Sequence, residues 1–122
     1  MISSILAGLI GAIVVGALAY AIVRIVFLTF SIIRDKIREI LNRHVGTIDK
    51  VAAVSVQALL DSAPEISLED FGPKVEEHDY LLFGIKEDGT LDEQADIIRA
   101  ESVDERLTDT MENYGGIIKI TG

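Results

Sequence analysis

Cysteine and tryptophan are absent from this chain of 122 residues, and proline occurs twice. Without cysteine, the protein can form neither disulfides nor thiolate metal sites. The sequence also lacks a GxSxG nucleophile elbow, an HExxH zinc motif and a glycine-rich loop for phosphates or dinucleotides. These absences predict a protein that is not an enzyme and that needs no cofactor or metal ion.

Charged side chains are missing from the first 23 residues. The stretch from Ile5 to Val23, ILAGLIGAIVVGALAYAIV, has about the length that a helix needs to cross the hydrocarbon core of a membrane. No basic residue precedes it, which argues against a secretory signal peptide. We therefore predict a transmembrane helix within residues 1–33.

The end of this predicted span is open, because Arg24 interrupts the apolar run and IVFLTFSII follows it. In one placement the helix ends near Arg24, whose guanidinium reaches the headgroups while Phe27 and Phe30 lie at the interface. In the other the helix is tilted and extends to Ile33, with Arg24 facing a protein interior. Both placements continue the helix through Val23.

Small residues recur every four positions along the predicted span, at Ser4, Gly8, Ala12 and Gly16. Residues four apart lie on one face of a helix, and small side chains there let a second helix backbone approach closely. This pattern predicts helix–helix packing through that face, either in a homo-oligomer or with another membrane protein.

Positive charge is concentrated directly after the apolar run. Residues 24–50 contain six Lys/Arg against three Asp/Glu, whereas residues 65–122 contain five against sixteen. Four cations, Arg24, Arg34, Lys36 and Arg38, are predicted to lie at the membrane interface and to contact anionic headgroups. Because Lys and Arg favour the cytoplasmic side, we expect a single-pass protein with its N-terminus outside and its C-terminal domain in the cytoplasm.

Residues 34–63 are predicted to form two helices. The first is basic and amphipathic, with an apolar stripe at steps of three and four residues. The second, from Ile48 to Ser62, contains VAAVSVQALL and is apolar on most faces, so it needs burial on several sides. We expect subunit or partner packing through Ile37, Leu41, Ile48, Val51 and Leu59.

Residues 64–122 are predicted to fold as a small acidic α+β domain of ββαβ type, preceded by one helical turn near Ser67–Phe71. Tyr80–Lys86 and Ala95–Ala100 have the composition of a hairpin around the turn sequence EDGT, and Ile117–Thr121 that of a last strand. The last strand is expected to pair in parallel with one strand of the hairpin.

A helix is predicted between the hairpin and the last strand. Ser102 followed by Glu105 matches a capping box, and Gly115-Gly116 is a stop signal. Val103, Leu107 and Met111 would then share one helical face. This helix would serve as the crossover that leads to the parallel last strand.

The carboxylates of the C-terminal domain favour a solvated acidic surface. Neither the cluster around Glu76 nor the one around Glu87 has the ligand spacing of an EF-hand. A surface of this charge repels phosphate backbones, so no nucleic-acid partner is expected. His44 lies on the apolar stripe of a predicted helix, which indicates a packed residue, and His78 has acidic neighbours in the sequence.

These features predict a non-enzymatic membrane protein that serves as a structural or assembly subunit of a larger membrane complex, or of a membrane-containing virus particle. Its partners would be the lipid bilayer and either further copies of itself or another membrane protein. The alternative hypothesis is an oligomeric pore or effector, lined by Arg24 and gated by a ligand that binds the acidic domain.

Overall fold

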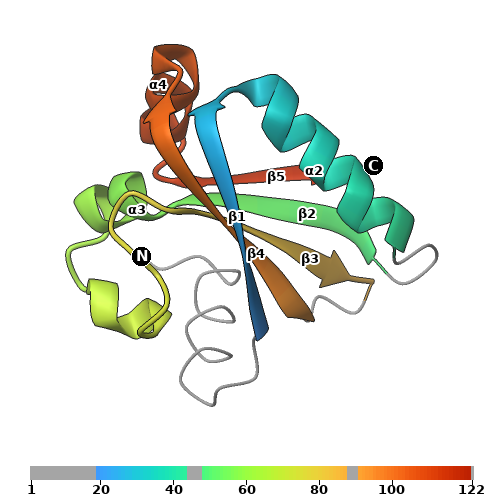
Figure 1. Ribbon diagram of the computed structural model, residues 1–122. Coiled ribbons are helices and arrows are strands. Elements are labelled where there is room, and N and C mark those ends of the chain that lie inside the picture. Colours follow the sequence, from blue (N-terminus) through green and yellow to red (C-terminus); the bar gives the residue numbers. More distant parts are fainter. Residues whose placement is uncertain (1–18, 44–47, 88–90, 122) are drawn as a thin grey trace.

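The computed structural model describes residues 19–43, 48–87 and 91–121, which form one mixed sheet with helices around it (Figure 1). In chain order the elements are β1 (Ala19–Leu28), α2 (Phe30–Arg43), β2 (Ile48–Ser55), α3 (Val56–Ser62), the 3₁₀ helix η1 (Leu68–Phe71), β3 (Tyr80–Lys86), β4 (Leu91–Val103), α4 (Glu105–Asn113) and β5 (Ile117–Thr121).

The strands lie side by side in the order β1-β4-β3-β2-β5. β1 runs parallel to β4, and the other three neighbouring pairs are antiparallel. The described residues therefore make a small α+β domain with a five-stranded mixed sheet. The predicted boundaries after residues 33 and 63 fall inside this unit, because β1 and β2 belong to the same sheet as β3, β4 and β5.

The first correction concerns residues 19–28, which form strand β1 and not the end of a transmembrane helix. Six of its ten side chains in AYAIVRIVFL are β-branched or aromatic, and such residues favour extended backbone. The strand pairs in continuous register with β4, from Ala19 opposite Gln94 to Leu28 opposite Val103. No helix in the part of the chain that the structure describes is long and apolar enough to cross a membrane.

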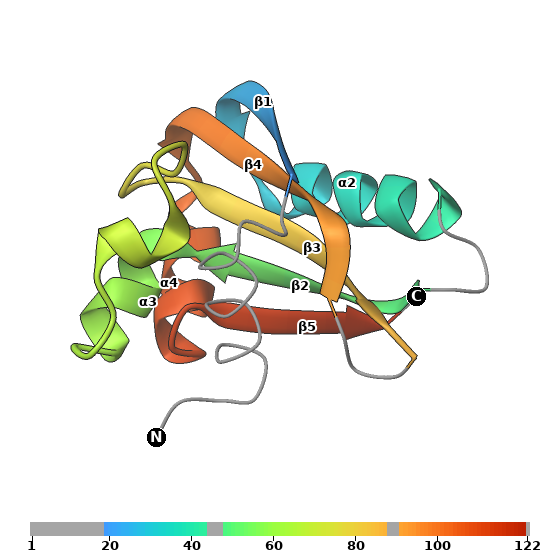
Figure 2. The same ribbon diagram turned by 90° about the horizontal axis from the view of Figure 1, so that it is seen from below.

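Helix α2 confirms the amphipathic helix predicted after the apolar run. It packs across β2 and β3 (Figure 2) and buries Ile33, Ile37 and Ile40 against the sheet. Arg34 and Arg38 lie on its exposed side. The spacing of three and four residues places the three isoleucines on one face, which explains why this helix covers the sheet.

The second correction concerns residues 48–62, which do not form one apolar helix. Residues 48–55 are strand β2, and only Val56–Ser62 are helical, as α3. β2 lies between β3 and β5, and both of its faces are buried under other parts of the chain. A central strand covered on both faces is apolar throughout, so VAAVS has the composition of a helix that is apolar all round.

The sheet separates two apolar clusters. On one face, the side chains of α2 and α4 pack against residues that include Val51, Leu82 and Ile98. On the other face, α3 and the connection from Ala63 to Val75 cover residues that include Phe83 and Ile97. The domain is therefore three layers deep around β2, β3 and β4, whereas β1 lies at one edge (Figures 1 and 2).

The C-terminal strands are confirmed, with β3 and β5 at the predicted bounds and β4 longer than predicted. η1 confirms the helical turn at residues 68–71. β4 continues to Val103, so Asp104, and not Ser102, caps α4 and accepts a hydrogen bond from the Arg106 amide. Gly115 and Gly116 end the helix with positive φ angles, as predicted.

The pairing of the last strand is the third correction. β5 runs antiparallel to β2 and does not pair in parallel with either strand of the β3–β4 hairpin. Both outer edges of the β3–β4 hairpin are occupied, by β2 and β1, so β5 pairs with the remaining edge of β2. The one parallel pair within the described residues joins β1 and β4.

Candidate interaction surface

β1 leaves one edge of the sheet open. It pairs with β4 on one side, and no strand of the described chain pairs with its other side. An edge strand presents unpaired backbone N–H and C=O groups, which are a template for another strand. β1 contains no proline, a single charged residue and no bulge in its pairing with β4, so it lacks the features that usually protect an edge.

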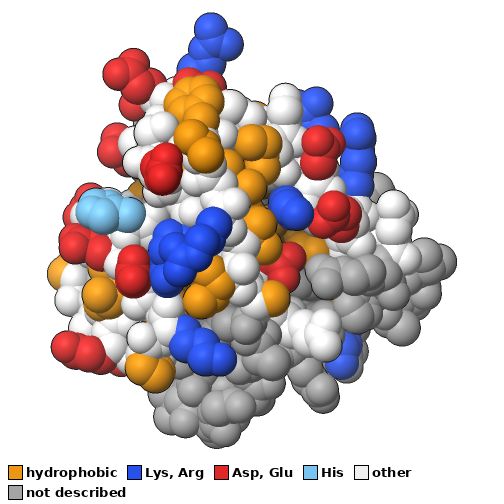
Figure 3. All heavy atoms as spheres, viewed as in Figure 1, with side chains coloured by type: hydrophobic (Ala, Val, Ile, Leu, Met, Phe, Trp, Pro, Cys, Tyr) orange, Lys and Arg blue, Asp and Glu red, His pale blue; other side chains and the backbone are white. Residues whose placement is uncertain are grey.

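Apolar side chains are exposed along this strand. Val26 is 71% exposed, Phe27 49% and Ile22 44%, and Phe30 at the start of α2 is 36% exposed. Figure 3 shows hydrophobic side chains gathered over β1, with Lys and Arg side chains beside them. Because strand side chains alternate, Ile22 and Val26 lie on one face of the sheet and Phe27 on the other. Exposed apolar side chains on both sides of an edge strand indicate a contact along that edge. We name Ile22, Val26, Phe27 and Phe30 the β1 patch.

Arg24 lies within the β1 patch. It is the neighbour of Arg99 on β4, and the two residues line a hollow of about 180 Å³ together with Ile25, Val26, Ala100 and Glu101. Within the described residues, no carboxylate pairs with Arg24 at ion-pair distance. Arg24 therefore places a positive charge, without a partner in this part of the chain, in the middle of an apolar strand edge.

Arg99 is held on the same face of the sheet by a bidentate ion pair. Its Nε donates to Asp79 Oδ1 at 2.9 Å, and its Nη2 donates to Asp79 Oδ2 at 2.8 Å and to the Lys74 carbonyl at 2.9 Å. Asp79 is 1% exposed, and Glu76 adds a second carboxylate at 3.3 Å. The hydrogen bonds that Arg99 donates to Asp79 raise the pKa of Arg99, so the guanidinium stays charged.

The four cations predicted at a membrane interface do not form one surface. Because strand side chains alternate, Arg24 and its neighbour Arg99 belong to the sheet face opposite α2. Arg34, Lys36 and Arg38 are carried by α2, where Lys36 lies 3.4 Å from Glu39 and Arg38 lies 3.9 Å from Asp35. The predicted basic stretch is therefore divided between two faces of the domain.

The residues predicted to pack against a subunit or partner lie inside the chain's own fold, which corrects that prediction. Ile37, Ile48, Val51 and Leu59 are 7% exposed or less, and Leu41 is partly buried against the cluster under α2. The sequence indicated that these side chains need burial, but the sheet formed by β1 to β5 supplies it. The predicted helix-packing residues Ser4, Gly8, Ala12 and Gly16 lie outside the described residues.

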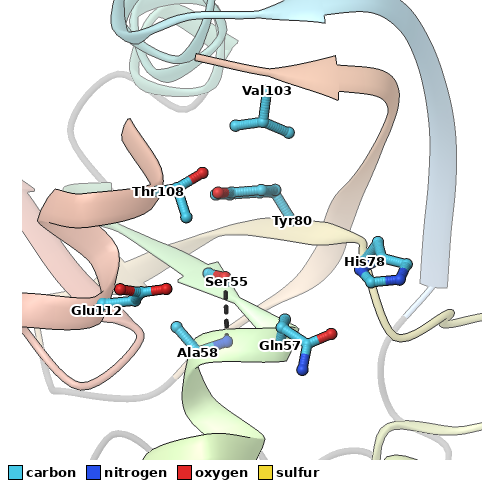
Figure 4. A pocket seen from close by; sticks show the side chains of 8 residues that line it. All are labelled: Ser55, Gln57, Ala58, His78, Tyr80, Val103, Thr108 and Glu112. Carbon is cyan, nitrogen blue, oxygen red and sulfur yellow. Dashed lines mark hydrogen bonds between the residues drawn. The ribbon is translucent and has the colours of Figure 1, made fainter. Parts of the chain in front are cut away.

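A small pocket lies where α3 meets α4 (Figure 4). Its lining includes Ser55, His78, Tyr80, Thr108 and Glu112, and its volume is about 120 Å³. Ligand sites for drug-sized molecules usually exceed about 300 Å³. Within the described residues no buried side-chain polar atom lacks a hydrogen-bond partner, so this pocket presents no unsatisfied group to a ligand.

Tyr80 carries a buried phenol in this pocket, beside the buried Ser55. Burial raises the pKa of its phenol, whereas hydrogen bonds with the side chains of Ser55 and Thr108 lower it and the charge of Glu112 raises it. Figure 4 shows the hydroxyl pointing toward Thr108, and Ser55 also accepts a hydrogen bond from the Ala58 amide at 3.3 Å. The arrangement joins β2, β3, α3 and α4, which is a structural role.

In the acidic cluster around Glu76, two carboxylates form ion pairs with an arginine of the chain itself. Asp79 and Glu76 surround Arg99, and His78 is exposed at the rim of the Tyr80 pocket. In the described ranges, no group of three or more His, Asp or Glu side chains is arranged to hold a metal ion.

Sequence reasoning did not find the two features that define this surface. The β-branched composition of AYAIVRIVFL was a signal for β1, but the uncharged residues before it favoured a longer helix. The Asp79–Arg99 pair joins residues twenty positions apart, and no local spacing indicates it. The described residues form a small α+β domain in which the edge strand β1 exposes apolar side chains.

No known protein family, curated protein or solved structure matches this chain.

Proposed function

We propose that this protein is a non-enzymatic, membrane-attached assembly subunit. The observation that carries the proposal is that the first 18 residues contain no charge and that β1 begins directly after them, at Ala19. If these residues were helical they would reach about 27 Å, close to the thickness of a hydrocarbon core. The domain would then sit against the membrane without a linker.

The described surface supports this placement through its composition. Phe27 and Phe30 are exposed near one end of β1, and aromatic residues favour the interface between membrane and water. Arg34 and Arg38 lie on the exposed side of α2 and can extend their guanidinium groups to anionic headgroups. The basic residues of α2 favour a cytoplasmic location for the domain, with the N-terminus outside, or the corresponding sides of a virus envelope.

The remainder of the domain is suited to protein partners. Its C-terminal part carries sixteen carboxylates against five cations, so it would repel nucleic acid and attract basic protein surfaces. The repeat at Ser4, Gly8, Ala12 and Gly16 supports helix packing within the membrane, in a homo-oligomer or with another membrane protein. Together these surfaces describe a subunit that organises a complex and catalyses no reaction.

The alternative of a pore lined by Arg24 has lost its main support. That hypothesis required Arg24 to face inward from a transmembrane helix, whereas Arg24 lies on strand β1 beside Arg99. We therefore retain the assembly hypothesis as the proposed function.

Fractionation of cells that express the full chain tests the proposal. The wild type should remain in the membrane pellet after extraction at alkaline pH, because an apolar span is not released by loss of charge interactions. Replacing Ile13 and Val14 with arginine should move the protein to the soluble fraction, since each central arginine costs about 3 kcal/mol on insertion. The control Tyr114→Arg changes a side chain that is 68% exposed on the domain and should not alter the distribution. Release of the wild type by alkaline extraction would overturn the proposal.

A further inference from the structure

We infer that β1 pairs with β1 of a second copy of this chain, antiparallel and about a two-fold axis that passes through Ile25. The two five-stranded sheets would then form one continuous sheet. The inference concerns a surface other than the N-terminal helix-packing face, and it does not depend on membrane attachment.

The first argument is that the open edge of β1 suits a strand better than lipid. Its ten residues leave a row of backbone N–H and C=O groups without a strand partner in the described chain. Such groups are costly in hydrocarbon, where no water can satisfy them. A second strand satisfies them with backbone hydrogen bonds and also covers exposed side chains such as Val26.

The second argument comes from the register that symmetry allows. In an antiparallel pair, residues directly opposite each other share one face of the sheet. The two-fold axis therefore passes midway between the two copies of one residue, and we name each possible axis by that residue. An axis through Arg24 places two guanidinium groups opposite each other, which is unfavourable. An axis through Val23 places Arg24 opposite Ile22 of the other copy, and an axis through Ile25 places it opposite Val26.

Charge complementarity favours the axis through Ile25. The register of β1 with β4 pairs Ile25 with Ala100 and Phe27 with Ser102, so Glu101 is level with Val26. Because strand side chains alternate, Arg24, Val26 and Glu101 lie on the face of the sheet opposite Ile25. In this register Arg24 lies directly opposite Val26 of the other copy. Glu101 of that copy lies on β4, which is the next strand beyond Val26. Neighbouring strands are about 4.8 Å apart, so the strands that carry Arg24 and Glu101 are separated by two such spacings. The long side chains of Arg24 and Glu101 can meet across the strand between them. The two-fold symmetry forms this ion pair twice. On the opposite face of the sheet, Ile25 of one copy lies directly opposite Ile25 of the other copy.

Cysteine scanning tests the register in the full chain, which has no cysteine of its own. Ile25→Cys, Val23→Cys and Arg24→Cys each introduce a single thiol, and mild oxidation is followed by a non-reducing gel. We expect the most cross-linked dimer for Ile25→Cys, because opposed β-carbons in an antiparallel pair can reach disulfide geometry. Asp109→Cys on the exposed side of α4 is the control and should stay monomeric on the gel. More dimer from position 23 or 24 than from position 25, or none from all three, would overturn the inference.

Charge substitutions at Val26 test the pairing independently of cysteine chemistry. Val26 is 71% exposed, so neither change disturbs the core of the monomer. Val26→Lys sets a cation opposite Arg24 of the other copy and should weaken the dimer about tenfold, since symmetry repeats the repulsion. Val26→Glu sets an opposite charge there and should retain the dimer or strengthen it.

The measured quantity is the dissociation constant of the dimer, from fluorescence energy transfer between labelled copies. The wild type and both Val26 variants are measured in one detergent. Equal weakening by both charges would contradict the register, and no effect of either would remove β1 from the interface. The variant with Gly8→Ile and Gly16→Ile should keep the β1 cross-link even if it loses association through the N-terminal segment. A cross-link that survives in a protein found in the soluble fraction would support the inference while it removes the proposed membrane attachment.

Discussion

The guanidinium of Arg99 binds both oxygens of the Asp79 carboxylate, at 2.9 and 2.8 Å, although Asp79 is 1% exposed. Asp79 also accepts a hydrogen bond from the Glu76 amide at 2.7 Å. The pair therefore fastens the turn before β3 to the middle of β4. Its partners compensate for the burial of a carboxylate, which would otherwise be strongly unfavourable.

Removal of Arg99 should destabilise the domain because it leaves Asp79 buried without its counter-charge. We expect Arg99→Gln to lower the free energy of unfolding by about 3 kcal/mol. The measurement is urea denaturation of the full chain in detergent, followed by circular dichroism. Glu76→Gln is the matched control, since Glu76 is 66% exposed and its ion pair contributes about 0–1 kcal/mol. A double variant with Asp79→Asn should recover part of the loss, and a purely additive effect would contradict the coupling.

Stability at alkaline pH should depend on Tyr80. Burial raises the pKa of its phenol above the ordinary value of 10.0, so the native state holds this proton more tightly than the unfolded chain does. The resulting stabilisation is fully present below about pH 10 and is lost as the pH rises toward the native pKa. The stability advantage of the wild type over Tyr80→Phe should therefore shrink above pH 10.

Thermal melting of both proteins at pH 8 and near pH 11 measures this difference. At pH 8 the variant should be less stable by about 1 kcal/mol, because its hydrogen bonds with Ser55 and Thr108 are gone. Tyr114→Phe changes a tyrosine that is 68% exposed and serves as the control for alkaline effects elsewhere in the chain. A difference between wild type and Tyr80→Phe that does not change with pH would contradict the argument.

The two glycines after α4 should differ in their tolerance of a side chain. A Cβ on Gly116, where φ is +94°, would lie 2.5 Å from the Leu59 nitrogen, so Gly116→Ala should cost about 3 kcal/mol. At Gly115, where φ is +69°, the nearest atom would be the Ser62 hydroxyl at 3.6 Å. Gly115→Ala should therefore cost about 1 kcal/mol, for backbone strain alone. Chemical denaturation of both variants tests the order, and equal losses would argue against the contact with Leu59.

Bulky residues in the N-terminal repeat should disrupt association through that segment. We predict that Gly8→Ile together with Gly16→Ile lowers the oligomer size, because larger side chains separate two packed helices. Native mass spectrometry or light scattering in detergent measures the size. Val14→Ile adds a methyl group without changing the small-residue face and should have no effect. An unchanged size for the double variant would exclude this packing surface.

The sequence predicted the C-terminal half of the fold more accurately than the N-terminal half. Tyr80–Lys86 and Ile117–Thr121 were identified at their observed bounds, because turns and glycines flank them and their apolar residues are local signals. For the segments that form β1 and β2, the sequence predicts helices. Both contain an apolar run, AYAIV in β1 and VAAV in β2, and a short run without polar alternation does not distinguish a strand from a helix.

The interaction surface was even less accessible to sequence reasoning. Val26 and Val51 are both valines within apolar runs, yet Val26 is 71% exposed and Val51 is fully buried. The difference arises because β2 lies in the centre of the sheet and β1 at its edge, which the pairing of distant segments decides. The sequence shows Arg24 as the charge that interrupts the apolar run, whereas its neighbour Arg99 follows only from the parallel pairing of β1 with β4.

The parallel pairing of β1 with β4 has a consequence during synthesis. Ala19 cannot pair until Gln94 has been synthesised, and Leu28 cannot pair until Val103 has been synthesised. Most of the chain therefore leaves the ribosome before β1 acquires its neighbour. In this interval AYAIVRIVFL is an apolar segment without a partner, which is the kind of segment that chaperones and membrane-targeting factors bind. Among the described strands, β1 would therefore stay without any neighbour for the longest part of synthesis.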